Sequence, residues 1–106
     1  MERTCWNTDL SALNINQKVT LLGWVSKRRN LGSILFIDLR DRSGLIQIMV
    51  KDADKIPDVR NEYVIQVKGV VSKRETPNPK MKTGAIEVLA DEIIVVNTAK
   101  TTPIII

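Results

Sequence analysis

The chain has 106 residues, a formal net charge of +4 and a hydrophobic fraction of 43%. This length fits one domain with one modest core. A single cysteine and no histidine exclude an internal disulfide and a His- or Cys-based zinc site. No apolar run is long enough for a membrane span or a signal peptide, so we expect a cytoplasmic protein with a reduced thiol.

The predicted elements begin with a short helical turn over residues 8–13, which carries capping residues at its start. A long strand is predicted over residues 18–28, where apolar residues alternate. Gly23 inside this strand indicates a bend or a bulge. Residues 34–40 and 45–50 predict two further strands, joined by a tight turn that ends in glycine, so these two strands form a hairpin.

The second half of the chain predicts two more strands. Residues 51–61 are polar and contain a central proline, so they hold at most a short helix. The fourth strand is predicted over residues 63–73. A loop with two prolines follows over residues 75–84. Residues 85–97 predict the fifth strand, with a break expected at Asp91.

Five strands, with glycines inside two of them and short connections, predict an all-β fold. A small antiparallel barrel satisfies this pattern, because closure of the sheet removes exposed strand edges. We expect the five-stranded Greek-key barrel of the oligonucleotide-binding type, the OB-fold, as one domain over residues 1–106. An SH3-like barrel is the second choice, since periodicity alone does not separate the two.

The only phenylalanine, Phe36, lies out of step with the apolar positions of its strand. It shares a face with Asp38 and Arg40, whereas the odd-numbered positions from 35 to 39 are all Leu or Ile. The alternation points Phe36 toward solvent, unless it packs against a loop. Gln47 falls on the corresponding face of the next strand, and its amide offers both a donor and an acceptor.

Basic residues gather in two places, at residues 27–29 and at residues 73–82. The first group is the consecutive triplet Lys27, Arg28 and Arg29, which we expect to contact phosphates or bases, although it could also be a solvated strand end. An exposed aromatic ring beside cationic side chains is typical of single-stranded nucleic-acid binding. A base stacked on such a ring contributes about 1–3 kcal/mol.

Four segments carry a resemblance to a known family: GWV at residues 23–25, KRRNLG at residues 27–32, FIDLRDR at residues 36–42 and TGAIEVLA at residues 83–90. They resemble the N-terminal anticodon-binding domain of bacterial-type aspartyl-tRNA synthetases, and the similarity covers nearly the whole chain. The resemblance implies an OB-fold that binds the anticodon loop of the aspartate tRNA, anticodon GUC, with its bases turned outward.

The resemblance also implies a role for each candidate site residue. Phe36 would stack on the middle uracil of the anticodon, and Gln47 together with Arg29 would hydrogen-bond that base. RNA specificity is commonly read from unstacked loop bases in this way, by aromatic stacking and edge hydrogen bonds.

Four further positions follow from the same resemblance. Glu87 would read the first anticodon base, because a carboxylate accepts the N–H groups of a guanine. Arg74 and Asn78 would lie near the third base, and Lys27 near the anticodon backbone or the first base. Each also has a structural alternative, as a solvated strand residue or as a residue selected for turn geometry.

Catalysis is not expected within these residues, because the barrel uses every predicted strand. The lone thiol of Cys5 has no histidine to activate it, and we expect no cofactor in this domain. The resemblance implies that ATP and Mg²⁺ belong to a class II catalytic domain absent from this chain. We therefore expect a fragment of a homodimeric ligase, whose partners are the tRNA anticodon loop and its own catalytic domain, with no DNA or membrane partner.

Two other classes of function stay open at this point. A non-specific single-strand-binding barrel would bind any oligonucleotide of similar length with similar affinity. A protein-interaction barrel would show no salt-dependent RNA binding at all.

Overall fold

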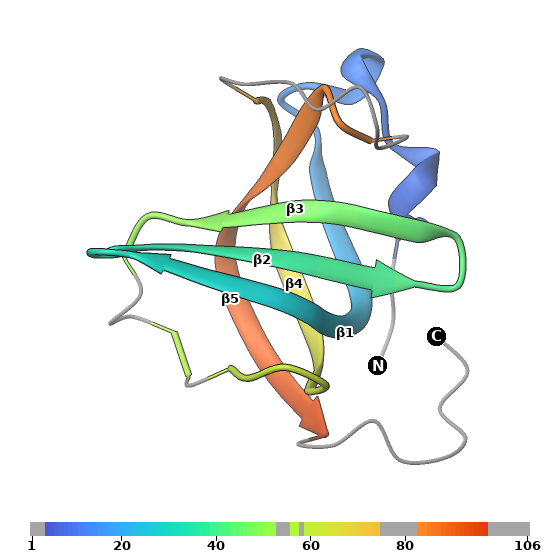
Figure 1. Cartoon of the computed structure of the whole chain (residues 1–106). Helices are drawn as coiled ribbons and strands as arrows, with labels where there is room; N and C mark the ends of the chain where they lie inside the picture. Colours follow the sequence, from blue (N-terminus) through green and yellow to red (C-terminus); the bar gives the residue numbers. More distant parts are fainter. Residues whose placement is uncertain (1–3, 53–55, 58, 75–82, 98–106) are drawn as a thin grey trace.

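The computed structural model describes residues 4–52, 56–57, 59–74 and 83–97. These residues form two short 3₁₀ turns followed by strands that wrap into a barrel (Figure 1). The elements are η1 (Asn7–Asp9), η2 (Ala12–Asn14), β1 (Lys18–Leu31), β2 (Ile34–Asp41), β3 (Gly44–Val50), β4 (Val64–Lys73) and β5 (Ile86–Asn97).

The strands close into a barrel in the order β1-β2-β3-β5-β4, with β4 pairing back onto β1. All strand pairs are antiparallel except β3 and β5, which run parallel where Gln47 to Met49 meet Glu87 to Leu89. The parallel pair arises because β5 inserts between β3 and β4 instead of following β4 at an edge. The predicted all-β, five-stranded barrel is confirmed, with this one parallel seam.

Two elements differ from the predictions by more than a shift of one residue. β1 continues to Leu31, so only Gly32 and Ser33 remain as the turn. The expected N-terminal helical turn is two separate 3₁₀ turns. Between β3 and β4, none of the described residues is helical. Within the described ranges, no helix has the length and apolar character needed to cross a bilayer.

The break expected at Asp91 is a β-bulge inside a continuous strand. Lys68 pairs with Glu92 and Gly69 pairs with Ala90, so Asp91 is the extra residue of β5. A bulge of this kind bends the strand and increases its twist, which a small barrel needs in order to close. β1 has a similar register shift after Val25.

The core is the inner face of the barrel. In β2 every second residue is buried, from Leu35 to Asp41, as alternation along a half-buried strand requires. The inner positions of all five strands supply Leu, Ile and Val side chains that are almost completely buried, among them Leu21, Ile37, Ile48, Val67 and Val88. This inner face leaves the other face of β2 and β3 free to carry polar and aromatic side chains.

Asp41 is a structural residue and not part of the charged surface. Its side chain is buried, and Oδ1 accepts hydrogen bonds from the Ser43 and Gly44 backbone N–H groups at 2.8 and 3.2 Å. Oδ2 accepts from the backbone N–H of Asn7 at 2.8 Å. The carboxylate thus holds the β2–β3 turn and ties the N-terminal segment to it.

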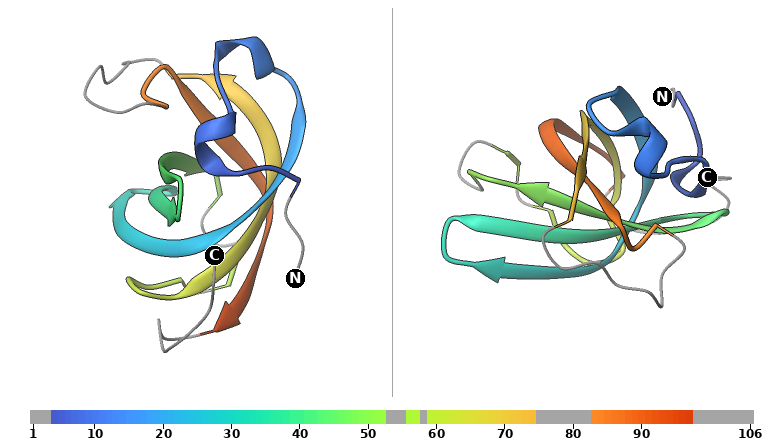
Figure 2. Two further views of the ribbon diagram at one scale, coloured as in Figure 1. Left: turned by 90° about the vertical axis from the view of Figure 1, so that its right-hand side faces the viewer. Right: turned by 90° about the horizontal axis from the view of Figure 1, so that it is seen from above.

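The β1–β2 hairpin extends beyond the barrel body, as the view from above shows (right panel of Figure 2). Its far end is formed by the pair Leu31 and Ile34. Because β3 runs beside β2 along most of this hairpin, the three strands form a projecting sheet. The outer face of that sheet carries the candidate site.

Candidate nucleic-acid interface

One face of the β1–β2–β3 sheet, continued onto β5, carries two adjacent cross-strand rows of side chains; we call it the hairpin face. Residues paired directly across antiparallel or parallel strands project on the same side of a sheet. The first row consists of Lys27, Asp38, Gln47 and Glu87, and the second of Arg29, Phe36, Met49 and Leu89.

A hollow of about 420 Å³ lies on the hairpin face, within the size range of small-ligand pockets. Its lining residues come from all five strands or their ends: Arg29, Leu31, Ile34, Phe36, Gln47, Met49, Arg74 and Glu87. Five of the predicted site residues, scattered over 59 positions of sequence between 29 and 87, are therefore gathered around one pocket.

Phe36 lines this pocket and lies outside the buried core. Its ring is half-buried, and the guanidinium carbon of Arg29 lies 5.4 Å from the ring centroid. That is within the range of a cation–π contact. The ring is thus held between strands while its outer side borders an open hollow, as a stacking platform requires.

Gln47 and Glu87 are buried, with 5% and 7% of their surface exposed. Gln47 Nε2 donates to Glu87 Oε1 at 2.8 Å, and Arg29 Nη2 donates to Gln47 Oε1 at 3.3 Å. A glutamate is rarely buried without a partner. The alternative of Glu87 as a solvated strand residue is therefore wrong, and the three side chains form one hydrogen-bonded chain.

The basic triplet is divided between two faces. Lys27 is exposed at the start of the first row of the hairpin face, whereas Arg28 pairs opposite the core residue Ile37 and so projects from the other face. The structure brings Lys27 and Arg29 to the site and leaves Arg28 away from it. Arg74 lines the pocket from just beyond β4, and Asn78 lies outside the described residues.

The predicted site residues do not include the apolar part of the pocket lining. Leu31, with 61% of its surface exposed, and Ile34 also line the pocket, and Met49 lies beside Phe36. The alternation of β3 places Met49 on the same face as Gln47, which was a readable signal. Leu31 lies beyond the predicted first strand, so the alternation gives no signal for its side chain.

The described part of the chain offers little support for a metal site or for a nucleophilic thiol. No group of three or more His, Cys, Asp or Glu side chains could hold a metal ion there. Burial raises the pKa of the Cys5 thiol. The hydrogen bond with Thr4 lowers this pKa, and the charges of Asp9 and Asp41 raise it further. The thiol is therefore protonated at neutral pH and is a weak nucleophile.

The fold and the hairpin face define a class of nucleic-acid-binding domain. Residues 19–96 match the family model described as OB-fold nucleic acid binding domain, and the chain belongs to this family. The predicted OB-fold is thereby confirmed.

Comparison over the whole sequence identifies particular relatives of this chain. The aspartate–tRNA ligase of Enterococcus faecalis is 52% identical over 110 residues, and that of Ruminiclostridium cellulolyticum is 46% identical over 113 residues. These alignments cover 96% and 100% of the chain but only 19% of either ligase. A crystal structure of a putative aspartyl-tRNA synthetase from Leishmania major superposes with a TM-score of 0.78 at 25% identity, covering 98% of this chain and 23% of that one. The predicted resemblance is confirmed.

Proposed function

We propose that this chain is the anticodon-binding module of an aspartate–tRNA ligase and that its hairpin face binds the GUC anticodon of the aspartate tRNA. The high identity to bacterial aspartate–tRNA ligases over nearly all of the chain supports the parent protein. The observation that carries the binding site is the single pocket that gathers Arg29, Phe36, Gln47, Arg74 and Glu87.

In the proposed complex the anticodon bases unstack and enter the pocket. The middle uracil stacks on Phe36, and Gln47 and Arg29 hydrogen-bond its edge. Glu87 accepts from the first base, and Arg74 lies near the third, with Asn78 proposed beside it. Because Gln47 and Glu87 hold each other by a hydrogen bond and Phe36 contacts Arg29 before RNA binds, little side-chain entropy is lost on association.

The remaining steps belong to the full-length ligase. We propose that a class II catalytic domain binds ATP and Mg²⁺, that the ligase is a cytoplasmic homodimer, and that docking of the anticodon on this barrel directs the acceptor end of the tRNA to that distant site.

A binding comparison tests the proposal. Two RNA hairpins with the same stem, one with the GUC anticodon loop and one with a scrambled loop of equal length, are titrated with the chain at moderate salt. A preference for GUC is expected. Equal, salt-sensitive binding to both hairpins would assign the barrel to non-specific single-strand binding, and absence of binding would favour a protein-interaction role.

Replacement of Lys27 tests whether the rim of the hairpin face contacts phosphate. We expect Lys27→Ala to weaken binding of the GUC hairpin and to reduce the slope of log K against log salt by about 0.7, the value for one phosphate contact on a single strand. The affinity is measured at several salt concentrations.

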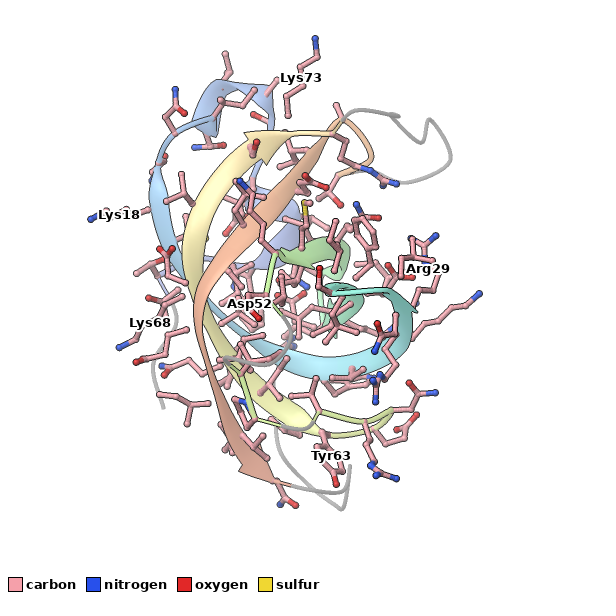
Figure 3. The ribbon with its side chains drawn as sticks, turned by 90° about the vertical axis from the view of Figure 1, so that its left-hand side faces the viewer. Lys18, Arg29, Asp52, Tyr63, Lys68 and Lys73 are labelled. Atoms are coloured by element: carbon pink, nitrogen blue, oxygen red, sulfur yellow. The ribbon has the colours of Figure 1, made fainter. Side chains whose placement is uncertain are left out.

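Lys68→Ala is the matched control for this experiment. Lys68 is also exposed, pairs with Glu92 at 3.7 Å, and lies on the opposite side of the barrel from Arg29 (Figure 3). We expect this variant to keep the wild-type slope. Equal slopes for Lys27→Ala and the unmodified chain would show that Lys27 contacts no phosphate.

A further inference from the structure

We infer that Glu87 is a positioning residue: its carboxylate fixes the orientation of the Gln47 side-chain amide and so decides whether the pocket accepts uracil or cytosine. This role rests on the proposed function. It differs from direct contact with the first anticodon base, which is the role that the family resemblance gives to Glu87.

The amide of Gln47 is held at both ends by groups of opposite charge. Gln47 and Glu87 are paired residues of the parallel β3–β5 seam, and Nε2 donates to Glu87 Oε1 at 2.8 Å. At the other end, Oε1 accepts from Arg29 Nη2 at 3.3 Å. Both Gln47 and Glu87 are more than nine-tenths buried, so water competes little for these contacts.

Only one orientation of the amide satisfies both neighbours. A carboxylate accepts hydrogen bonds and cannot donate them, whereas a guanidinium donates and cannot accept. Rotating the amide of Gln47 by half a turn would set its carbonyl oxygen against Glu87 and its NH₂ group against Arg29. Both hydrogen bonds would be lost in a site where unsatisfied polar groups are costly. The amide orientation is therefore fixed before RNA arrives.

The fixed amide gives the pocket a defined order of donors and acceptors. Nε2 keeps a second N–H, Oε1 keeps a second lone pair, and Arg29 keeps further N–H groups. From the Glu87 side to the Arg29 side, these free groups run donor, acceptor, donor.

The order matches one pyrimidine and rejects the other. The Watson–Crick edge of uracil runs acceptor, donor, acceptor, and complements the pocket at all three positions. The edge of cytosine runs donor, acceptor, acceptor, and satisfies one position in either direction. With the amide of Gln47 reversed, the pocket would run acceptor, donor, donor, which complements cytosine completely. Glu87, by holding the amide, selects uracil without having to touch it.

The test compares three RNA hairpins with one stem, carrying the anticodons GUC, GCC and AUC. We expect the unmodified chain to bind GUC more tightly than GCC. In Glu87→Gln, residue 87 can donate as well as accept, so it no longer fixes the amide of Gln47, and only Arg29 still opposes the reversed orientation. The GUC-to-GCC affinity ratio should then fall about tenfold, within the range that one edge-specific contact contributes. Thermal unfolding checks that the near-isosteric variant folds.

The matched control is Glu92→Gln, which removes one negative charge from the same strand. Glu92 is exposed and pairs with Lys68 on β4, away from the pocket. We expect it to keep the wild-type GUC-to-GCC ratio. If Glu87→Gln changes only the preference between GUC and AUC, Glu87 reads the first base and the positioning role is overturned, while the proposed function stands.

A second measurement needs no RNA and holds even if anticodon binding fails. The side-chain amide protons of Gln47 are observed by NMR in the free chain. We expect their resonances to move in Glu87→Gln and to stay in place in Glu92→Gln. Should Glu87→Gln not fold, Glu87→Asp replaces it, because the shorter carboxylate withdraws from Nε2 and should produce the same change to a smaller degree. Unmoved Gln47 resonances in a folded variant would overturn the inference.

Discussion

Phe36→Ala is expected to weaken binding of the GUC hairpin by roughly 5- to 150-fold, corresponding to the 1–3 kcal/mol that stacking of one base on an aromatic ring contributes. Among the residues that the structure describes, Phe36 is the only aromatic one lining the pocket, so no neighbour can take over its role. The affinity is measured by titration of labelled hairpin at fixed salt.

The fold should survive this replacement. Phe36 lies on the hairpin face, is half-buried, and makes no part of the inner core. The replacement removes its contact with Arg29, at 5.4 Å, and its packing beside Met49 on the surface of the sheet. An exposed cation–π contact is worth about 0.5–1 kcal/mol. The unfolding midpoint in urea should therefore fall only slightly.

Phe36→Tyr is the matched control, because it keeps the ring and should keep most of the affinity. Wild-type affinity in Phe36→Ala would contradict stacking at this position. Loss of the folded state in Phe36→Ala would instead assign the ring to the barrel's packing, and Phe36→Tyr would then be the variant on which binding is compared.

Gly69→Val is expected to lower the free energy of unfolding by more than about 3 kcal/mol, at or beyond the upper end of ordinary overpacking effects. A Cβ at this position would overlap the carbonyl oxygen of Leu89 and would lie 2.9 Å from Val88 Cγ1. The bulge at Asp91 sets this close approach, since Gly69 pairs with Ala90 immediately beside it. The backbone of β4 cannot move away from β5 at this point without breaking the β4–β5 pairing that closes the barrel.

Urea unfolding followed by circular dichroism measures this change, with Gly69→Ala expected to act in the same direction but less strongly. Gly32→Ala is the control. Gly32 has a φ of +70° but nothing within 4 Å of a Cβ, so this variant carries only the left-handed backbone cost of about 1–2 kcal/mol. If Gly69→Val is no more destabilising than Gly32→Ala, the close approach of β5 is not a fixed feature of the barrel.

Local sequence patterns predicted most of the fold. Alternation in residues 34–40 separated the core positions from the face of Phe36, because a strand turns successive side chains to opposite sides. The turn that ends in Gly44 indicated the β2–β3 hairpin, and the glycines indicated a curved sheet. These signals depend on neighbours in the chain and need no knowledge of the fold.

Strand lengths and the connection of the sheet were harder to predict. The predicted first strand ends at Arg28, yet β1 continues to Leu31 because β2 supplies hydrogen-bonding partners over that whole length. The parallel seam between β3 and β5 joins positions 47–49 to 87–89, a pairing that no local pattern indicates.

The sequence by itself determined the polar and aromatic members of this site: one aromatic ring, one amide, one carboxylate and a set of cations on strands of a small barrel. Only the tertiary structure decided how they combine. Arg28 leaves the site because a register shift in β1 sets Lys27 and Arg29 on the opposite face, and Glu87 joins Gln47 because β5 inserts beside β3. Burial and hydrogen bonding between residues 40 positions apart depend on barrel closure, which is a property of the whole chain.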